Sequence, residues 1–120
     1  MRILKKYYEK FFLPAVISDA TALKYVPYEL RTFELYKIAV SKDPMLLRDV
    51  NSAIKGYYKL CEIAVSKNSL ALCFVNENYR TFELCKMAVD NSSDRRIIQC
   101  TPPQFYYKIF DYWKSLYHNK

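Results

Sequence analysis

The sequence has almost no glycine: Gly56 is the only one among 120 residues. Antiparallel sandwiches and barrels need many tight turns with positive φ, and glycine usually occupies those positions. The scarcity of glycine therefore argues against an all-β fold and favours helices. Of the residues, 52% are hydrophobic and 17% are aromatic, which is more apolar material than a disordered chain contains. The composition predicts one folded, all-α domain over residues 1–120.

The chain also lacks a long hydrophobic run. The longest one, at residues 11–17, contains Pro14 and is too short to cross a bilayer. The basic N-terminus, MRILKKYYEK, is not followed by the apolar segment that a signal peptide has. We therefore expect an intracellular protein without a membrane partner.

Histidine is nearly absent, and the four cysteines lie far apart. Cys61, Cys73, Cys85 and Cys100 form no C-x-x-C pair, and His118 is the only histidine. Zinc sites normally take ligands in closely spaced pairs, so no metal site is expected. The simplest interpretation is that all four cysteines are reduced and buried, as in the cytoplasm or nucleus.

The common catalytic motifs are missing as well. The sequence contains no G-x-S-x-G, no glycine-rich phosphate loop and no H-E-x-x-H. The single histidine is the third residue from the end of the sequence, where a solvated side chain is a simpler interpretation than a general base. We expect no catalytic residue, no cofactor and no small-molecule substrate, and hence a protein that is not an enzyme.

What the sequence does contain is an internal repeat. RTFELYKIAV at residues 31–40 returns as RTFELCKMAV at residues 80–89, and GYYKLCEIAV at residues 56–65 is an intermediate copy. Ala-Val pairs begin at residues 15, 39, 64 and 88, so the period is 24 or 25 residues. The extra residue of the longer period lies around Gly56. The units are expected at about residues 1–19, 20–43, 44–68 and 69–91, followed by a C-terminal half-unit at 92–120.

Each unit is expected to contain a short helical segment and a longer helix. Thr32 and Thr81 are suitable N-caps, each followed by a glutamate in the first turn. Thr101 and Gln104 have the spacing of a capping box at the start of the last helix. Pro14 falls inside the first longer helix, which it should kink or restart.

Helices as short as those expected in each unit are unstable alone in water. The longer helix of each unit is also apolar over most of its circumference, so it must pack between neighbouring helices. The alanines expected to be buried at the helix crossings are Ala39, Ala64 and Ala88. The predicted fold is an all-α, compact, solenoid-like array of about four two-helix units with an aromatic C-terminal capping helix.

Charged residues recur with the same period. Side chains of alternating sign form one row of Lys10, Glu34, Lys59, Glu83 and Lys108 and a second of Lys37, Glu62, Lys86 and Asp111. Because equivalent helices should lie side by side, we expect ion pairs across each junction. A basic residue also precedes each longer helix, at Arg31, Lys55 and Arg80. Arg31 and Arg80 either contact an extended partner or pair with the glutamate three residues on, which is the preferred interpretation.

The repeated pattern ALxxVPxELRTxELCxxAVxxN resembles short helical repeats of uncharacterised bacterial proteins and of proteins of large DNA viruses. The similarity covers about residues 15–91, and Asn51 and Asn76 stand where the first copy has Pro27. The resemblance implies an α-helical array and brings no catalytic residue with it. The Lys-, Tyr- and Asn-rich, glycine-poor composition is similar to that of large-virus proteins, whose location would be the virion or the infected host cell.

Positive charge is concentrated at the two ends. Residues 1–14 carry +3 and residues 92–120 carry +3, which together make +6 of the net charge of +7. One interpretation is that these are solvated cap surfaces, and the other is that they contact phosphates. The residues for such contacts are Arg2, Lys5, Lys6, Lys10, Arg95, Arg96, Lys114 and Lys120.

Aromatic residues gather at the same ends, where 11 of the 20 are found. The last helix either folds over the open end of the core or offers its rings to a protein partner or a second copy. The residues expected at such an interface are Phe105, Tyr106, Tyr112, Trp113 and Tyr117. The predicted function is a non-catalytic interaction or structural module that self-associates through its aromatic ends. The alternative is a nucleic-acid-binding protein without sequence preference that uses its basic ends.

Overall fold

The computed structural model describes residues 2–118, and within this range it contains helices and no strand, which confirms the all-α class. The α-helices are α1 (Arg2–Tyr7), α2 (Leu13–Ser18), α3 (Phe33–Lys42), α4 (Tyr57–Lys67), α5 (Phe82–Asn91), α6 (Arg96–Gln99) and α7 (Tyr106–Tyr117). The other helical segments are a π-helix η1 (Tyr8–Phe12) and the 3-10 helices η2 (Ala20–Tyr25), η3 (Tyr28–Leu30), η4 (Pro44–Asp49), η5 (Ser69–Phe74), η6 (Glu77–Tyr79) and η7 (Pro103–Phe105).

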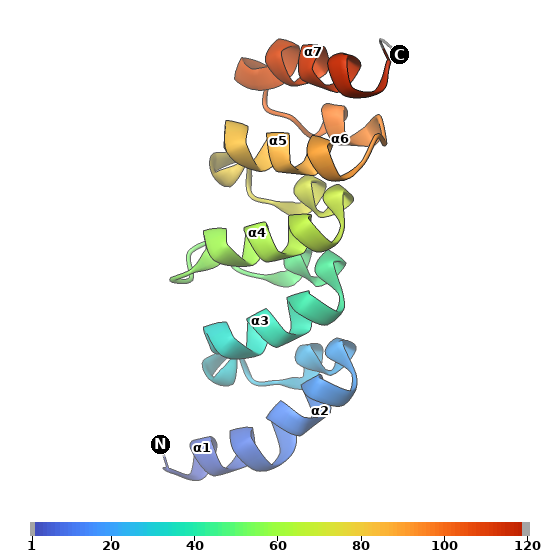
Figure 1. Ribbon diagram of the computed structural model, residues 1–120. Coiled ribbons are helices and arrows are strands. Elements are labelled where there is room, and N and C mark those ends of the chain that lie inside the picture. The colour runs from blue at the N-terminus through green and yellow to red at the C-terminus, as the bar shows by residue number, and fades with distance from the viewer. Residues whose placement is uncertain (1, 119–120) are drawn as a thin grey trace.

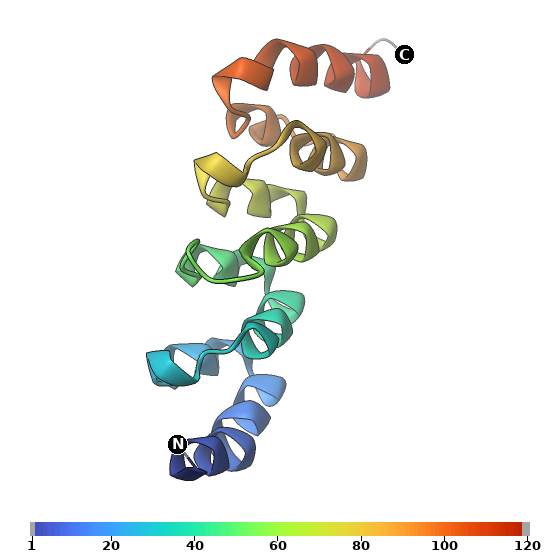
Figure 2. The same ribbon diagram turned by 90° about the vertical axis from the view of Figure 1, so that its left-hand side faces the viewer.

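The elements are arranged in two columns along an axis of 58 Å, with the other extents only 25 and 16 Å. In the first column, α3 packs between α2 and α4, and α5 packs between α4 and α7 (Figure 1). Figure 2 shows the second column, which consists of the 3-10 segments and α6 beside the longer helices. Between one longer helix and the next, the chain crosses to the second column and returns to the first.

The expected N-caps of α3 and α5 are confirmed. The Thr32 hydroxyl accepts a hydrogen bond from the Leu35 amide at 3.2 Å, and the Thr81 hydroxyl accepts one from the Leu84 amide at 3.1 Å. Each cap satisfies one of the amides that has no partner in the first turn of a helix. The same sequence, R-T-F-E-L, thus folds in the same way at both places.

The expected capping box at Thr101 is wrong. The Thr101 hydroxyl donates backwards to the Ile97 carbonyl at 3.4 Å, and α7 begins later, at Tyr106, without a side-chain cap. The cause is the Pro102–Pro103 pair, because a proline pushes the residue before it out of the α region. Pro102 accordingly has an extended ψ of 148°, and the segment that follows it is the short 3-10 helix η7 rather than the start of an α-helix.

The expected short helical segments are present, but they are 3-10 helices. Each begins at an Asx residue whose side-chain oxygen accepts a hydrogen bond from the amide two residues on. The three bonds are Asp19 with Thr21 at 3.0 Å, Asp43 with Met45 at 3.1 Å, and Asn68 with Leu70 at 3.0 Å. Because Asp and Asn side chains copy a backbone turn in this way, they end the preceding α-helix and start the next segment.

Gly56 and Pro14, the two residues expected to interrupt the helices, lie at helix starts. Gly56 has φ of 90° and forms the left-handed N-cap of α4, which takes up the extra residue of the longer period. Pro14 lies in the first turn of α2, and the π-helix η1 directly precedes it. A proline has no N–H for the helical ladder, so the first long helix changes its pitch there and restarts.

The core runs the length of both columns. Ala39, Ala64 and Ala88 are fully buried, as expected where helices cross closely. Larger side chains surround them on the same helices, of which Leu35, Leu60, Leu84 and Ile109 are also buried. These four residues are one repeat apart from each other, so each longer helix turns the same position toward its neighbours.

The expected ion pairs between helices are absent. Glu34, Lys59 and Glu83 are exposed, but the only ion pair within residues 5–118 joins Arg96 to Asp94. Long exposed side chains lose entropy when they pair in water and gain little in return. The prediction that the alternating rows pair across the junctions is therefore wrong.

The expectation of four reduced cysteines is wrong for two of them. Cys73 at the end of η5 and Cys100 after α6 form a disulfide, with their Cα atoms 5.1 Å apart. Cys61 and Cys85 are free and buried, and burial raises the pKa of each thiol to about 11. The bond ties the C-terminal part of the second column to the unit before it. It does not identify a compartment, and the intracellular location stays a prediction.

Candidate functional site

The C-terminal helix α7 closes one end of the core. It packs against α5 and α6, and Ile109 on its inner side is fully buried. Trp113 is only 6% exposed, and its indole N–H donates to the Ser93 carbonyl at 2.9 Å. The expectation that Trp113 anchors an intermolecular contact is therefore wrong, because the side chain covers the core of its own chain.

Three other aromatic residues expected at an interface are also held within the chain. The Tyr112 hydroxyl donates to the Asp90 carboxylate, and the Tyr117 hydroxyl donates to the Val89 carbonyl at 2.6 Å. The hydrogen bond with Asp90 raises the pKa of Tyr112. The Phe105 ring packs edge-on against Phe82, with 5.9 Å between the ring centres.

The Tyr106 ring packs against the Phe110 ring, and Tyr106 is still 39% exposed. Its neighbour Tyr107, which was not selected from the sequence, is the most exposed aromatic residue of α7, at 78%. The helical spacing of α7 places Tyr107 away from buried Ile109. That signal was present in the sequence, but choosing the face required knowledge of where α5 lies.

A groove of about 330 Å³ lies between α6 and α7. Its lining consists of Arg95, Ile98, Gln99, Tyr106, Phe110, Trp113, Lys114 and His118. Two residues expected at an interface, Tyr106 and Trp113, thus meet two expected to contact phosphates, Arg95 and Lys114. Among the described residues, no carboxylate lines the groove.

The rings of this groove follow one another along α7. The Phe110 ring lies between those of Tyr106 and Trp113, at centre-to-centre distances of 6.2 and 6.3 Å. The interplanar angles are 3° and 20°, so the three rings are nearly parallel. Arg95 lies over Trp113 at 5.4 Å, and Lys114 lies over Phe110 at 5.1 Å. The groove therefore combines two cations with three aligned aromatic rings.

Arg96, although adjacent to Arg95, has a different environment. Its guanidinium donates to both carboxylate oxygens of Asp94, with a closest distance of 2.6 Å. These hydrogen bonds lower the pKa of Asp94 and leave the charge of Arg96 compensated. Arg96 does not line the groove. Of the two arginines, only Arg95 offers an uncompensated charge there.

The N-terminal end presents a second basic and aromatic surface. Lys5, Lys6 and Lys10 are exposed around a shallow hollow that also includes Glu9. Phe11 is 52% exposed, and the Lys10 ammonium lies over its ring at 5.9 Å. Two further residues expected to contact phosphates, Lys120 and the side chain of Arg2, lie outside the described part of the chain.

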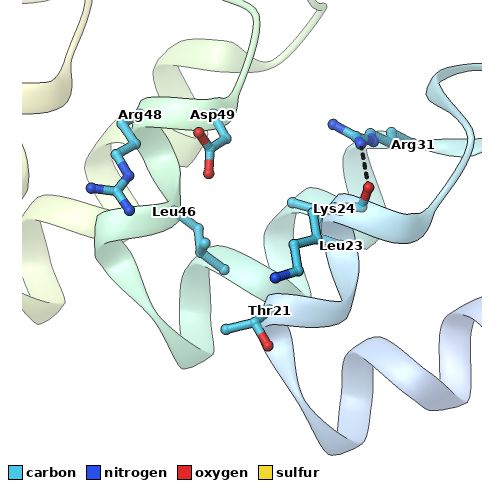
Figure 3. Close-up of a pocket in the computed structure, with 7 residues that line it drawn as sticks. All are labelled: Thr21, Leu23, Lys24, Arg31, Leu46, Arg48 and Asp49. Atoms are coloured by element: carbon cyan, nitrogen blue, oxygen red, sulfur yellow. Dashed lines mark hydrogen bonds between the residues drawn. The ribbon is translucent and has the colours of Figure 1, made fainter.

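A third hollow, of about 430 Å³, lies between η2 and η4 (Figure 3). Thr21, Leu23, Lys24, Arg31, Leu46, Arg48 and Asp49 line it. The Asp49 carboxylate stands among the three basic residues, so this hollow has mixed charge. The charges that line this hollow favour neither an anionic nor a cationic ligand.

Arg31 has a structural role at this hollow. Its Nε donates to the Val26 carbonyl at 2.9 Å, and its Nη2 donates to the Lys24 carbonyl at 3.4 Å. Arg80 makes the same two bonds, to the carbonyls five and seven residues before it, at 2.8 and 3.1 Å. Arg80 adds a third bond, from Nη1 to the Cys100 carbonyl at 3.0 Å. Neither arginine pairs with the glutamate three residues on, so the preferred sequence interpretation is wrong. The two side chains bind the carbonyls that the 3-10 helices leave open at their ends.

Other features of the described residues add no further site. Residues 2–118 contain no helix that is both long enough and apolar enough to cross a membrane. In the same part of the chain, no three His, Cys, Asp or Glu side chains are placed together as metal ligands. The chain matches no protein-family model, no curated protein and no solved structure.

Proposed function

We propose that the protein is a non-catalytic interaction module, built as a solenoid-like array of about four two-helix units. The array is supported by the Asx turns at Asp19, Asp43 and Asn68 and by the buried alanines, both of which recur every 24–25 residues. The resemblance to short repeats of bacterial and large-DNA-virus proteins belongs to this proposal and rests on the sequence pattern. In such arrays each unit buries its apolar faces against the next unit. Each end unit therefore has one face without a neighbouring unit.

The absence of a poised reactive group supports a binding role. Tyr57, Cys61 and Cys85 are the groups with the largest pKa shifts, to about 12, 11 and 11. Burial is the first cause in each case, and it stabilises the neutral form that is the poorer nucleophile. None of the three lines the C-terminal groove.

The single observation that carries self-association is the exposure of Phe11. By repeat spacing, Phe11 occupies the position of Leu35, Leu60, Leu84 and Ile109, which are all buried. Phe11 is half exposed instead, and Tyr7, whose ring stacks on that of Phe11 at 5.6 Å, is exposed to a similar extent. A face that a neighbouring helix covers in every later unit is therefore open on the first one. We propose that a second copy of the chain covers it, since aromatic residues are enriched at the centres of such contacts.

Light scattering from micromolar to millimolar concentration tests this proposal. The wild-type protein is expected to dimerise, and Tyr7→Ser/Phe11→Ser is expected to remain a folded monomer. Tyr25→Ser is the matched control, because Tyr25 is 73% exposed but lies at the end of η2, in the second column, and not on the end helix. A wild-type protein that stays monomeric throughout the range would exclude self-association, and equal effects of the two variants would exclude the Phe11 face as the contact.

A further inference from the structure

We propose that the groove between α6 and α7 binds single-stranded nucleic acid, with Arg95 and Lys114 each contacting a phosphate and the aromatic rings contacting an unpaired base. This inference goes beyond the proposed self-association, which concerns the opposite end of the molecule (Figure 1). It depends on the charge of the groove, on its rings and on their accessibility.

The charge of the groove suits a phosphate. Arg95 and Lys114 both line it, and neither forms an ion pair within the described residues. The acidic residue nearest to Arg95 in sequence, Asp94, accepts hydrogen bonds from Arg96 on both of its carboxylate oxygens. Cations that are free of carboxylates attract a polyanion, and each phosphate contact releases counterions from the strand.

The rings distinguish a nucleic acid from a simple anion. Tyr106, Phe110 and Trp113 are nearly parallel, and they lie on one side of α7 at spacings of four and three residues. Tyr106 is 39% exposed at the outer end of this row, where a further planar group has access. Aromatic side chains beside a basic groove are the usual means of binding single strands, because every base has a face that can stack.

The shape favours a single strand over a duplex. A duplex keeps its bases stacked inside and offers mainly phosphates to a small basic surface, which would leave the rings without a role. An unpaired base can instead leave the strand and enter a hollow of about 330 Å³. An acidic peptide would match the cations as well, but it would not use the rings.

Trp113 makes the test direct, because it is the only tryptophan and it lines the groove. A short oligothymidylate is titrated into the full-length protein while tryptophan fluorescence is recorded at several salt concentrations. Saturable quenching is expected, and the logarithm of the affinity should fall with the logarithm of salt with a slope of about −1.4 for two contacts. Polyglutamate of matched charge and a DNA duplex of the same length serve as competitors.

Matched variants separate the groove from general charge. Arg95→Ala and Lys114→Ala should each reduce the magnitude of the salt slope by about 0.7. Tyr106→Ala should weaken oligothymidylate binding but leave the weak binding of polyglutamate unchanged. Lys67→Ala removes the same charge from an exposed residue of α4 that does not line the groove, and it should leave the slope and the affinity unchanged. Circular dichroism confirms that each variant is folded.

Four outcomes would overturn the inference. The first is a lack of quenching at low salt. The second is polyglutamate binding as tightly as oligothymidylate, which would indicate an acidic protein partner. The third is tighter binding of the duplex than of the single strand. The fourth is an equal loss from Arg95→Ala and Lys67→Ala, which would indicate attraction by net charge alone.

Discussion

Phe33 and Gly56, from successive units, touch so closely that a Cβ atom on Gly56 would lie 2.8 Å from two carbons of the Phe33 ring. Gly56 also has a φ of 90°, which residues with a side chain rarely adopt. Glycine is therefore required at this position for two reasons: the backbone has a positive φ, and the Phe33 ring leaves no room for a Cβ atom. It marks the place where the period lengthens to 25 residues.

Replacing Gly56 by alanine should lower the free energy of unfolding by about 1–3 kcal/mol, from backbone strain together with the contact to Phe33. Urea denaturation followed by circular dichroism measures the change. Lys55→Ala is the control, because Lys55 is exposed and precedes the glycine. In a Phe33→Ala background the steric part should vanish and the backbone part should remain. An unchanged midpoint for Gly56→Ala would show that the turn does not need a left-handed residue.

The disulfide between Cys73 and Cys100 should stabilise the C-terminal end. It closes a loop with a sequence separation of 27, for which the chain-entropy model gives about 3.5 kcal/mol. Reduction should lower the urea midpoint of the wild-type protein by a corresponding amount. Cys73→Ser/Cys100→Ser should have the lower midpoint from the start and should not respond to reductant.

Thiol counting provides an independent check of the same bond. Alkylation after unfolding without reductant should label two cysteines, Cys61 and Cys85, and reduction should expose four. Four labelled cysteines in the unreduced protein would contradict the pairing and restore the interpretation of four free thiols.

The two free thiols should make stability fall at high pH. Burial raises the pKa of Cys61 and Cys85 from an ordinary 9.0 to about 11. Below pH 9 both thiols are protonated in the folded and the unfolded chain, so they contribute no pH dependence. Between pH 9 and 11 the unfolded chain loses protons that the folded chain retains, and the free energy of unfolding decreases. Urea denaturation across this range measures the decrease.

Cys61→Ala/Cys85→Ala is the control for this decrease. The variant is expected to start with a lower stability, because it loses two buried sulfur atoms, but to show a shallower decline from pH 9 to 11. An identical decline in both proteins would assign the pH dependence to other groups, of which Tyr57 is the first candidate.

The sequence contains enough information for the local structure of each unit. The Thr and Asx caps act within two or three residues, so Thr32 and Thr81 cap their helices wherever those helices pack. The burial of Ala39, Ala64 and Ala88 follows from periodicity, because a helix that is apolar on most sides has neighbours on most sides. The caps and the buried alanines are determined by short sequence segments, so they recur wherever those segments recur.

Features that depend on distant contacts could not be predicted in the same way. Cys73 and Cys100 meet because η5 packs against α6, and nothing in their spacing indicates this. The face of α7 is fixed by α5, so the sequence did not show that Trp113 is buried while Tyr107 is exposed. The groove of the candidate site exists only because α6 and α7 come together, although Arg95 and Lys114 were recognised as candidates separately.

A comparison of Arg31 with Arg80 measures how much the hydrogen bond from Arg80 to the Cys100 carbonyl contributes to the free energy of unfolding. Both bind the open carbonyls of the 3-10 helix before them, and Arg80 alone adds the bond from Nη1 to the Cys100 carbonyl. Lysine keeps the charge but cannot place donors on several carbonyls at once. Arg80→Lys should therefore lower the free energy of unfolding more than Arg31→Lys, by about 1.5 kcal/mol for the extra charged hydrogen bond.

Urea denaturation of the two variants and of Arg31→Lys/Arg80→Lys measures this difference. The sites lie two units apart, so the effects should add in the double variant. The comparison should also depend on the disulfide, because Cys100 supplies the third carbonyl. In reduced protein the extra loss for Arg80→Lys should shrink as the Cys100 segment becomes free to move. Equal losses for the two arginines under oxidising conditions would show that the third bond adds nothing to the stability of the C-terminal end.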